Sequence, residues 1–154
     1  MDPKIALLLE MERSVWSHIW QNLTGLTEEE YRWRPLPQAN DINWILRHLA
    51  GYERYCGNIV RGVDVGRGHW PDAPFPQIKR DLEELTADYQ QAIAPLRWDE
   101  VTYEVTYGRG RTRRLNDLLS YHPLHTSGHR FQIRYIRGTH ARLTGKDKRV
   151  FDPG

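Results

Sequence analysis

The stretch "YHPLHTSGHRFQIRYIRG", Tyr121–Gly138, holds three of the chain's seven histidines. Histidines and apolar side chains recur there every three or four residues, which is the period of one helix face. His122, His125 and His129 therefore occupy the row that an amphipathic helix usually fills with leucine or isoleucine. We predict a helix that begins near Leu115, ends with this stretch and turns its histidines toward the interior.

Three earlier segments show the same helical period. Apolar residues repeat at three and four positions over residues 5–23, 42–60 and 76–93. Glu12 interrupts the apolar stripe of the first segment. Turn and capping signals separate the segments, namely Gly25, the capping box "TEEE" at 27–30, Pro35 and Pro37, and the loop "GVDVGRGHWPDAPFP" at 62–76.

The segment "VTYEVTY", Val101–Tyr107, alternates β-branched or aromatic residues with polar ones and is followed by a "GRG" turn. This pattern is typical of a short strand or hairpin. The whole chain therefore predicts an all-α fold, a four-helix bundle with a strand element between the third and fourth helices. We place the bundle at residues 1–138 and expect residues 139–154 to form a polar, loosely attached tail.

Composition narrows the class of protein. A chain of 154 residues, 39% hydrophobic and 27% charged, is expected to form one globular domain. The single cysteine, Cys56, fits a cytoplasmic protein, and no apolar run is long enough to suggest a signal peptide or membrane helix. The net charge of +2 and the absence of a nucleic-acid motif argue against a nucleic-acid partner.

The inward histidines suggest a metal site. Residues four apart on a helix have Cβ atoms about 5–6 Å apart, so His125 and His129 can reach one ion. His122 and His129 are separated by roughly 10.5 Å along the axis, so this helix is unsuited to supply all three ligands. His48, on the apolar face of the second helix, is the candidate third ligand. The alternative is a hydrogen-bonded network of core histidines without an ion.

Three segments resemble the DinB-like (DinB/YfiT) family of four-helix-bundle metalloproteins. These are "LTEEEYRWRP" (26–35), "INWILRHLAGYE" (42–53) and "LHTSGHRFQIRYI" (124–136), and the resemblance extends over about residues 5–138. It implies that His48, His125 and His129 are the metal ligands, as inferred above from geometry, and that His122 lies outside the set. Phe131 departs from the family's usual small residue, which could narrow the pocket or crowd a dimer contact.

The resemblance also implies a chemistry. The family includes divalent-metal-dependent thiol transferases and isomerases that use low-molecular-weight thiols such as bacillithiol or mycothiol. We therefore expect a metal-dependent thiol S-transferase that acts on a small molecule, with Zn or Ni as the ion and Fe or Mn as further options. A homodimer is also expected. The alternatives are a non-catalytic, stress-associated metal-binding protein and a metal-dependent hydrolase.

Other polar residues have open roles. Glu12 either bonds to a ligand histidine or lies at a solvated edge, and Tyr52 is an accessory candidate expected in the core. Cys56 is expected to be buried and outside the site. The arginine-rich stretch "GRGRTRR" (108–114) either binds a substrate carboxylate near the bundle mouth or is merely exposed charge. Three further histidines are expected in solvent: His18, His69 and His140.

Overall fold

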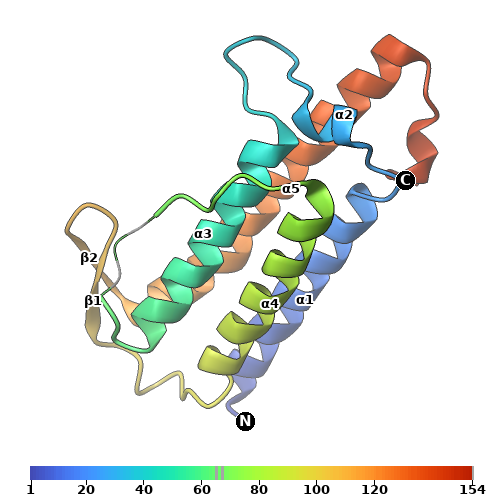
Figure 1. The fold of residues 1–154 in the computed structure, drawn as a ribbon. Helices are drawn as coiled ribbons and strands as arrows, with labels where there is room; N and C mark the ends of the chain where they lie inside the picture. The colour runs from blue at the N-terminus through green and yellow to red at the C-terminus, as the bar shows by residue number, and fades with distance from the viewer. Residues whose placement is uncertain (65, 67, 154) are drawn as a thin grey trace.

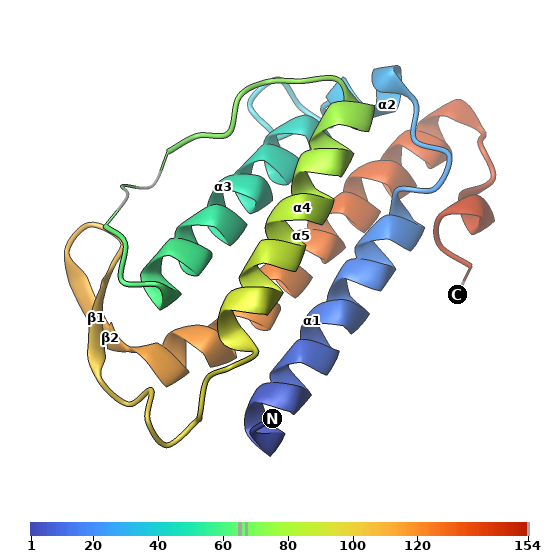
Figure 2. The ribbon, with the colours of Figure 1, turned by 60° about the horizontal axis from the view of Figure 1, so that its bottom comes forward.

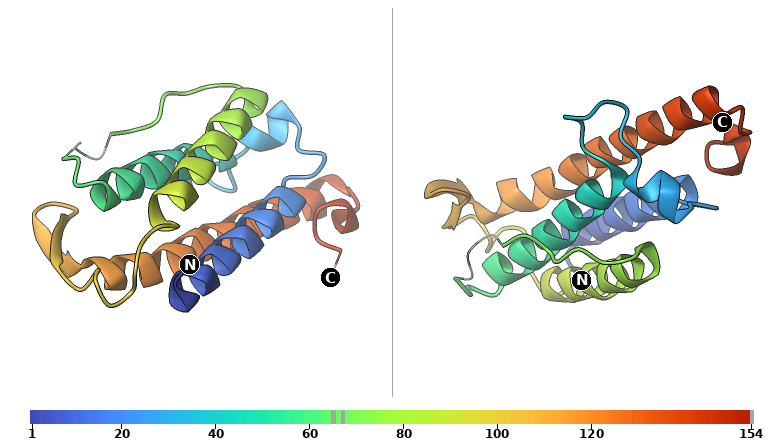
Figure 3. Two further views of the ribbon diagram at one scale, coloured as in Figure 1. Left: turned by 90° about the horizontal axis from the view of Figure 1, so that it is seen from below. Right: turned by 45° about the horizontal axis from the view of Figure 1, so that its top comes forward.

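The protein is mostly helical, and the computed structural model describes residues 1–64, 66 and 68–153. Four long helices lie side by side, with a hairpin at one end and the C-terminal segment at the other (Figures 1 and 3). The elements are α1 (Pro3–Asn22), α2 (Glu28–Arg32), α3 (Ile42–Val60), α4 (Phe75–Ile93), β1 (Glu104–Tyr107), β2 (Arg111–Arg114), α5 (Leu115–Thr144) and the 3-10 turn η1 (Lys148–Val150). Val65 and Arg67 of the predicted loop, and Gly154 of the predicted tail, lie outside the described residues.

The helices form where the sequence pattern predicts them. Helix α3 packs against α4 and α5, and α1 packs against α5 (Figure 2). The predicted strand element is an antiparallel hairpin between α4 and α5, with Glu104 opposite Arg114 and Tyr107 opposite Arg111. The all-α expectation and its strand element are thus confirmed. Within the described residues, no helix has both the length and the apolar character needed to cross a membrane.

Capping residues explain where α1, α2 and α3 begin. The Asp2 side chain accepts from the backbone amides at the start of α1, and Asp41 Oδ1 accepts from Trp44 N at 2.7 Å at the start of α3. Thr27 and Glu30 form the predicted reciprocal capping box around α2. Gly62, with a φ of 69°, lies two residues after α3 in the left-handed region that favours glycine.

The C-terminal segment corrects the prediction of a loosely attached tail. Helix α5 continues past Gly138 to Thr144, and Gly145 ends it with a φ of 70°. The chain then folds back onto α1, where Asn22 Nδ2 donates to the Phe151 carbonyl at 2.8 Å. The Phe151 ring is buried under the Arg137 guanidinium. The prediction was wrong because a glycine inside a helix lowers its stability without having to end it.

The core divides into two apolar clusters along the helix axes. One, which includes Trp16 and Ile133, fills the end toward the C-terminal segment. The other, which includes Tyr89 and Leu118, fills the end toward the hairpin. On α1 and α5, the ionisable side chains of the two groups described below lie between the positions that contribute to these two clusters. On α3, His48 lies among residues of the first cluster and Glu53 among residues of the second.

Candidate metal centre

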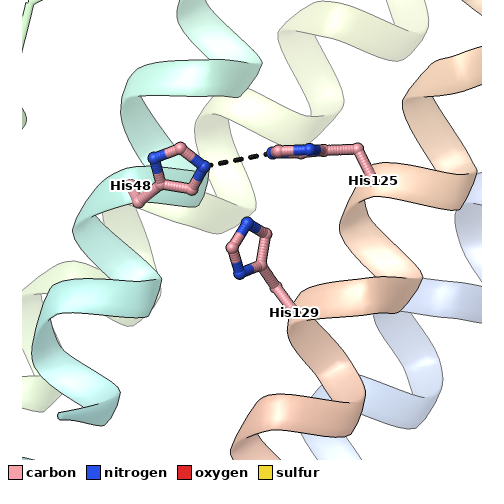
Figure 4. A group of neighbouring side chains, drawn as sticks. All are labelled: His48, His125 and His129. Carbon is pink, nitrogen blue, oxygen red and sulfur yellow. Dashed lines mark hydrogen bonds between the residues drawn. The ribbon is translucent and has the colours of Figure 1, made fainter. Parts of the chain in front are cut away.

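Three histidine side chains converge between α3 and α5. His48 points from α3 toward His125 and His129, which project from successive turns of α5 (Figure 4). The Nε2 atoms of His48 and His125 are 3.1 Å apart. One ring nitrogen from each of the three histidines lies within 4.8 Å of the others, and all three side chains are half-buried. The structure thus brings together the three residues that the sequence selects.

The separation of these nitrogens fits a metal ion. Two nitrogens bound at about 2.0–2.1 Å in a tetrahedral site lie roughly 3.3 Å apart, close to the His48–His125 distance. Neutral imidazoles are good ligands for Zn, Ni, Fe and related ions. In a metal-free protein the same two nitrogens share a hydrogen bond instead, with one ring as the donor. The donor set and its spacing therefore suit a divalent transition metal.

Neighbouring side chains orient the three imidazoles. His129 Nδ1 lies 2.8 Å from Gln132 Oε1, and since an amide oxygen only accepts, the proton belongs on Nδ1. This tautomer leaves Nε2 as the nitrogen that can bind an ion. The Trp44 ring stacks on His48 with centroids 5.1 Å apart and planes 4° from parallel. The Tyr52 ring lies 4.1 Å from that of His125.

A second group of ionisable side chains lies deeper in the core. Glu12 on α1, Glu53 on α3 and His122 on α5 are each at most 1% exposed. His122 Nδ1 is 2.5 Å from Glu12 Oε1, and His122 Nε2 is 3.3 Å from Glu53 Oε1. These residues also have the chemistry and proximity to hold a metal. The described residues therefore contain two groups that could do so.

The histidine of this second group, His122, is protonated at neutral pH. Burial alone would lower the pKa of His122, but Glu53 and Glu12 outweigh it and raise that pKa to about 10. Burial raises the pKa of the Glu53 carboxyl, an effect that His122 partly offsets. At neutral pH His122 is therefore an imidazolium between two carboxyl groups. The 2.5 Å contact with Glu12 is a hydrogen-bond distance, shorter than the roughly 3.3 Å between neighbouring ligands of one ion.

Glu12, Tyr52 and Cys56 are all buried. Glu12 does not lie at a solvated edge, because its carboxylate is buried and contacts His122. Tyr52 is in the core, as predicted, and its ring stacks on that of His122 and lies 4.1 Å from that of His125. Burial raises the pKa of Tyr52, so its phenol is neutral. Cys56 is buried beside the second apolar cluster, as predicted.

The three remaining histidines differ in their exposure to solvent. His18 and His69 are exposed, as predicted. His140 is 3% exposed, which contradicts the prediction, because α5 extends beyond residue 138 and carries it under the connection between α1 and α3. There its ring packs edge-on against Trp33, and its Nδ1 lies 3.4 Å from Glu30 Oε1.

Sequence reasoning missed two residues near the histidines. Glu53 has apolar neighbours three and four positions away on both sides, which was a usable signal that it is buried. Gln132 lies three residues after His129, a spacing that allows side-chain contact on a helix. The sequence pattern places it near the histidine row but assigns it no contact with His129.

The candidate metal centre opens onto a cavity. A space of about 870 Å³ is lined by Trp44, His48 and Tyr55 of α3 and by the hairpin loop. Phe131, whose ring is 54% exposed, is not among the lining residues, so it does not narrow this space. A cavity of this size is typical of a small-molecule site.

Comparison with known families gives one match. The DinB superfamily matches the chain over residues 9–133, a range that contains α1 from its second turn, the hairpin, and all three histidines of the candidate metal centre. No curated protein matches the chain.

Proposed function

The chain belongs to the DinB superfamily, and we propose that it is a divalent-metal-dependent enzyme that transfers a low-molecular-weight thiol to a small-molecule substrate. The ion is held by His48, His125 and His129 within the four-helix bundle formed by α1, α3, α4 and α5. The observation that carries this proposal is the convergence of three imidazoles, one of which, that of His48, lines a cavity large enough for a small molecule.

Three protein ligands are typical of catalytic metal sites, because they leave a coordination position for a reactant. A divalent ion in such a site lowers the pKa of a bound thiol and supplies its thiolate at neutral pH. The residues around it hold the geometry. Gln132 keeps the His129 proton on Nδ1, and Trp44 supports the His48 ring.

The disposition of carboxylates favours thiol transfer over hydrolysis. A hydrolase needs a general base close to the bound water. Glu12 and Glu53 face His122 in the core instead of the cavity, and among the described lining residues Asp64 is the only carboxylate. Thiol transfer would need no such base, because an ion held by the three histidines would favour the thiolate form, which is itself a nucleophile.

The proposal also covers the identity of the metal ion, the location of the protein and its oligomeric state. Zn or Ni is the expected ion, since both accept imidazole and thiolate ligands, and Fe or Mn would also fit three histidines. We further propose a cytoplasmic location and a homodimer.

The test compares metal-loaded with metal-free protein. Each form is given a panel of thiols, including cysteine, bacillithiol and mycothiol, together with an electrophile such as chlorodinitrobenzene. We expect transfer only with the metal-loaded form. His125→Ala should abolish it, whereas His18→Ala, which changes an exposed histidine, should leave it unchanged. Metal binding without transfer of any thiol would favour the non-catalytic alternative. Thiol transfer at the same rate by the metal-free and the metal-loaded protein would contradict the proposal.

A further inference from the structure

The cavity beside the candidate metal centre extends well beyond it. Its lining begins at Trp44 and His48, continues along α3 through Tyr55, and ends at the hairpin loop, residues 108–110. Tyr55 is seven residues after His48, which corresponds to about 10 Å along a helix. A molecule that reaches from His48 to the hairpin loop must therefore be elongated.

Two arginines lie at the hairpin end of this cavity. Arg109 and Arg111, from the hairpin loop and the start of β2, both line it. Across the part of the chain that the structure describes, neither arginine forms an ion pair. Guanidinium groups bind carboxylate and phosphate oxygens well, because their donors are planar and paired. Two such groups without an ion-pair partner among the described residues, at one end of a cavity, suit an anionic ligand.

The hairpin holds these arginines in place. Tyr55 Oη accepts a hydrogen bond from Gly108 N at 2.8 Å, which ties the loop to α3. The Arg111 guanidinium packs over the Tyr107 ring, 5.8 Å from its centroid. Arg109 has a φ of 47°, and no other non-glycine residue of the described chain has a positive φ. A glycine or asparagine would adopt that backbone conformation more easily than an arginine does.

We propose that this cavity binds an elongated small molecule whose carboxylate or phosphate group is held by Arg109 and Arg111 while its other, reactive end reaches His48. The inference deepens the proposed function and rests on it for the reactive end. It assigns the substrate class as anionic, with about 10 Å between the anionic group and the reacting atom. It also gives a role to the arginine-rich stretch 108–114, which the sequence alone favours as simple exposed charge.

The test uses Co²⁺-loaded protein and three thiol probes. Thiolate binding to cobalt gives an absorption band that reports occupancy of the metal centre directly. Mercaptooctanoate carries its sulfur and carboxylate about 10 Å apart when extended. Mercaptooctanol has the same length without the charge, and mercaptopropionate has the charge without the length. We expect mercaptooctanoate to bind about 10- to 100-fold more tightly than either, since hydrogen bonds to charged groups are strong.

Variants of the hairpin arginines test whether these side chains recognise the carboxylate of the probe. The double variant Arg109→Gln, Arg111→Gln should reduce the affinity for mercaptooctanoate to that for mercaptooctanol, whose own affinity should not change. Arg113→Gln is the matched control, because Arg113 lies on the same strand and does not line the cavity. Circular dichroism checks that each variant keeps its helical content.

The outcomes are distinguishable. Equal affinities for mercaptooctanoate and mercaptooctanol in the unaltered protein would overturn the proposal, and so would an unchanged preference in the double variant. In both cases the band from mercaptooctanol would leave the proposed function standing. If no thiol produces the band, the proposed function fails, and with it the claim that the reactive end of the ligand reaches the metal centre.

Discussion

His122 Nδ1 lies 2.5 Å from Glu12 Oε1 and joins α5 to α1 inside the core. The second ring nitrogen of His122 faces Glu53 of α3 at 3.3 Å, so one imidazolium connects three helices. His125 follows three residues later on α5, and its ring lies 4.1 Å from that of Tyr52, which stacks on His122. The buried charges thus fix α5 relative to α3, the two helices that supply the candidate ligands.

Removing the imidazolium should strongly destabilise the fold. His122→Ala leaves the carboxyl groups of Glu12 and Glu53 buried without their cation, and breaking a buried pair in this way costs about 3–5 kcal/mol. Urea denaturation measures the loss. His18→Ala, at an exposed position, should change the free energy of unfolding by no more than about 0.5 kcal/mol. Similar effects for the two variants would show that the core contact contributes nothing.

The same contact predicts a pH dependence. The folded-state pKa of His122 is about 10 against an ordinary value of 6.5. A raised histidine pKa stabilises the folded state fully below about pH 6.5, and this stabilisation is lost as the pH rises through about 10. The raised pKa of Glu53 acts in the same direction, since the folded state keeps a proton that the unfolded chain has lost.

The measurement is urea denaturation of the unaltered protein and His122→Gln over this pH range. Buried tyrosines such as Tyr31 and Tyr89 also have raised pKa values. Their ionisation therefore lowers the free energy of unfolding of both proteins at high pH. The informative quantity is therefore the difference between the two free energies of unfolding. It should shrink steadily from about pH 6.5 toward pH 10. A constant difference would mean that His122 is not charged in the folded protein.

Local patterns were sufficient to predict the helices and the three candidate ligands. The spacing of His125 and His129 is set within one helix, and His48 marks its own helix face. Glu12 and Glu53 could not be paired with His122 in this way, because their partner lies on another helix and helix adjacency is a property of the packed fold. His140 was misplaced for a related reason, since its burial depends on a helix end that Gly138 does not define.

Gln132 should control metal affinity without being a ligand. Its Oε1 accepts from His129 Nδ1, and such contacts around a metal site typically change affinity by about 10- to 100-fold. Gln132→Ala should therefore weaken binding in a chelator competition while the ion-to-chain ratio at saturating metal stays the same. Gln91→Ala, also exposed but on α4, serves as the control. Equal affinities in the two variants would rule out the role of Gln132.

The proposed homodimer can be tested on the outer face of α5. Large apolar side chains are exposed there at spacings of three, four and seven residues, namely Tyr121, Leu124, Phe131 and Tyr135. This spacing is typical of helix–helix contacts. Light scattering should give about twice the 18.2 kDa chain mass. Phe131→Glu should shift the protein to monomer and Leu7→Glu, an exposed position on α1, should not. A monomeric unaltered protein refutes the dimer.

The most direct test of the metal centre is the metal content of four single variants purified with the same divalent ion. We expect one ion per chain in the unaltered protein and little or none in His48→Ala, His125→Ala or His129→Ala, because two imidazoles are too few to hold it firmly. His122→Ala should keep about one ion per folded chain, since its ring faces Glu12 and Glu53 instead of the cavity. If His122→Ala loses the ion while His48→Ala keeps it, the metal belongs to the Glu12–Glu53–His122 group and the assignment made here is wrong.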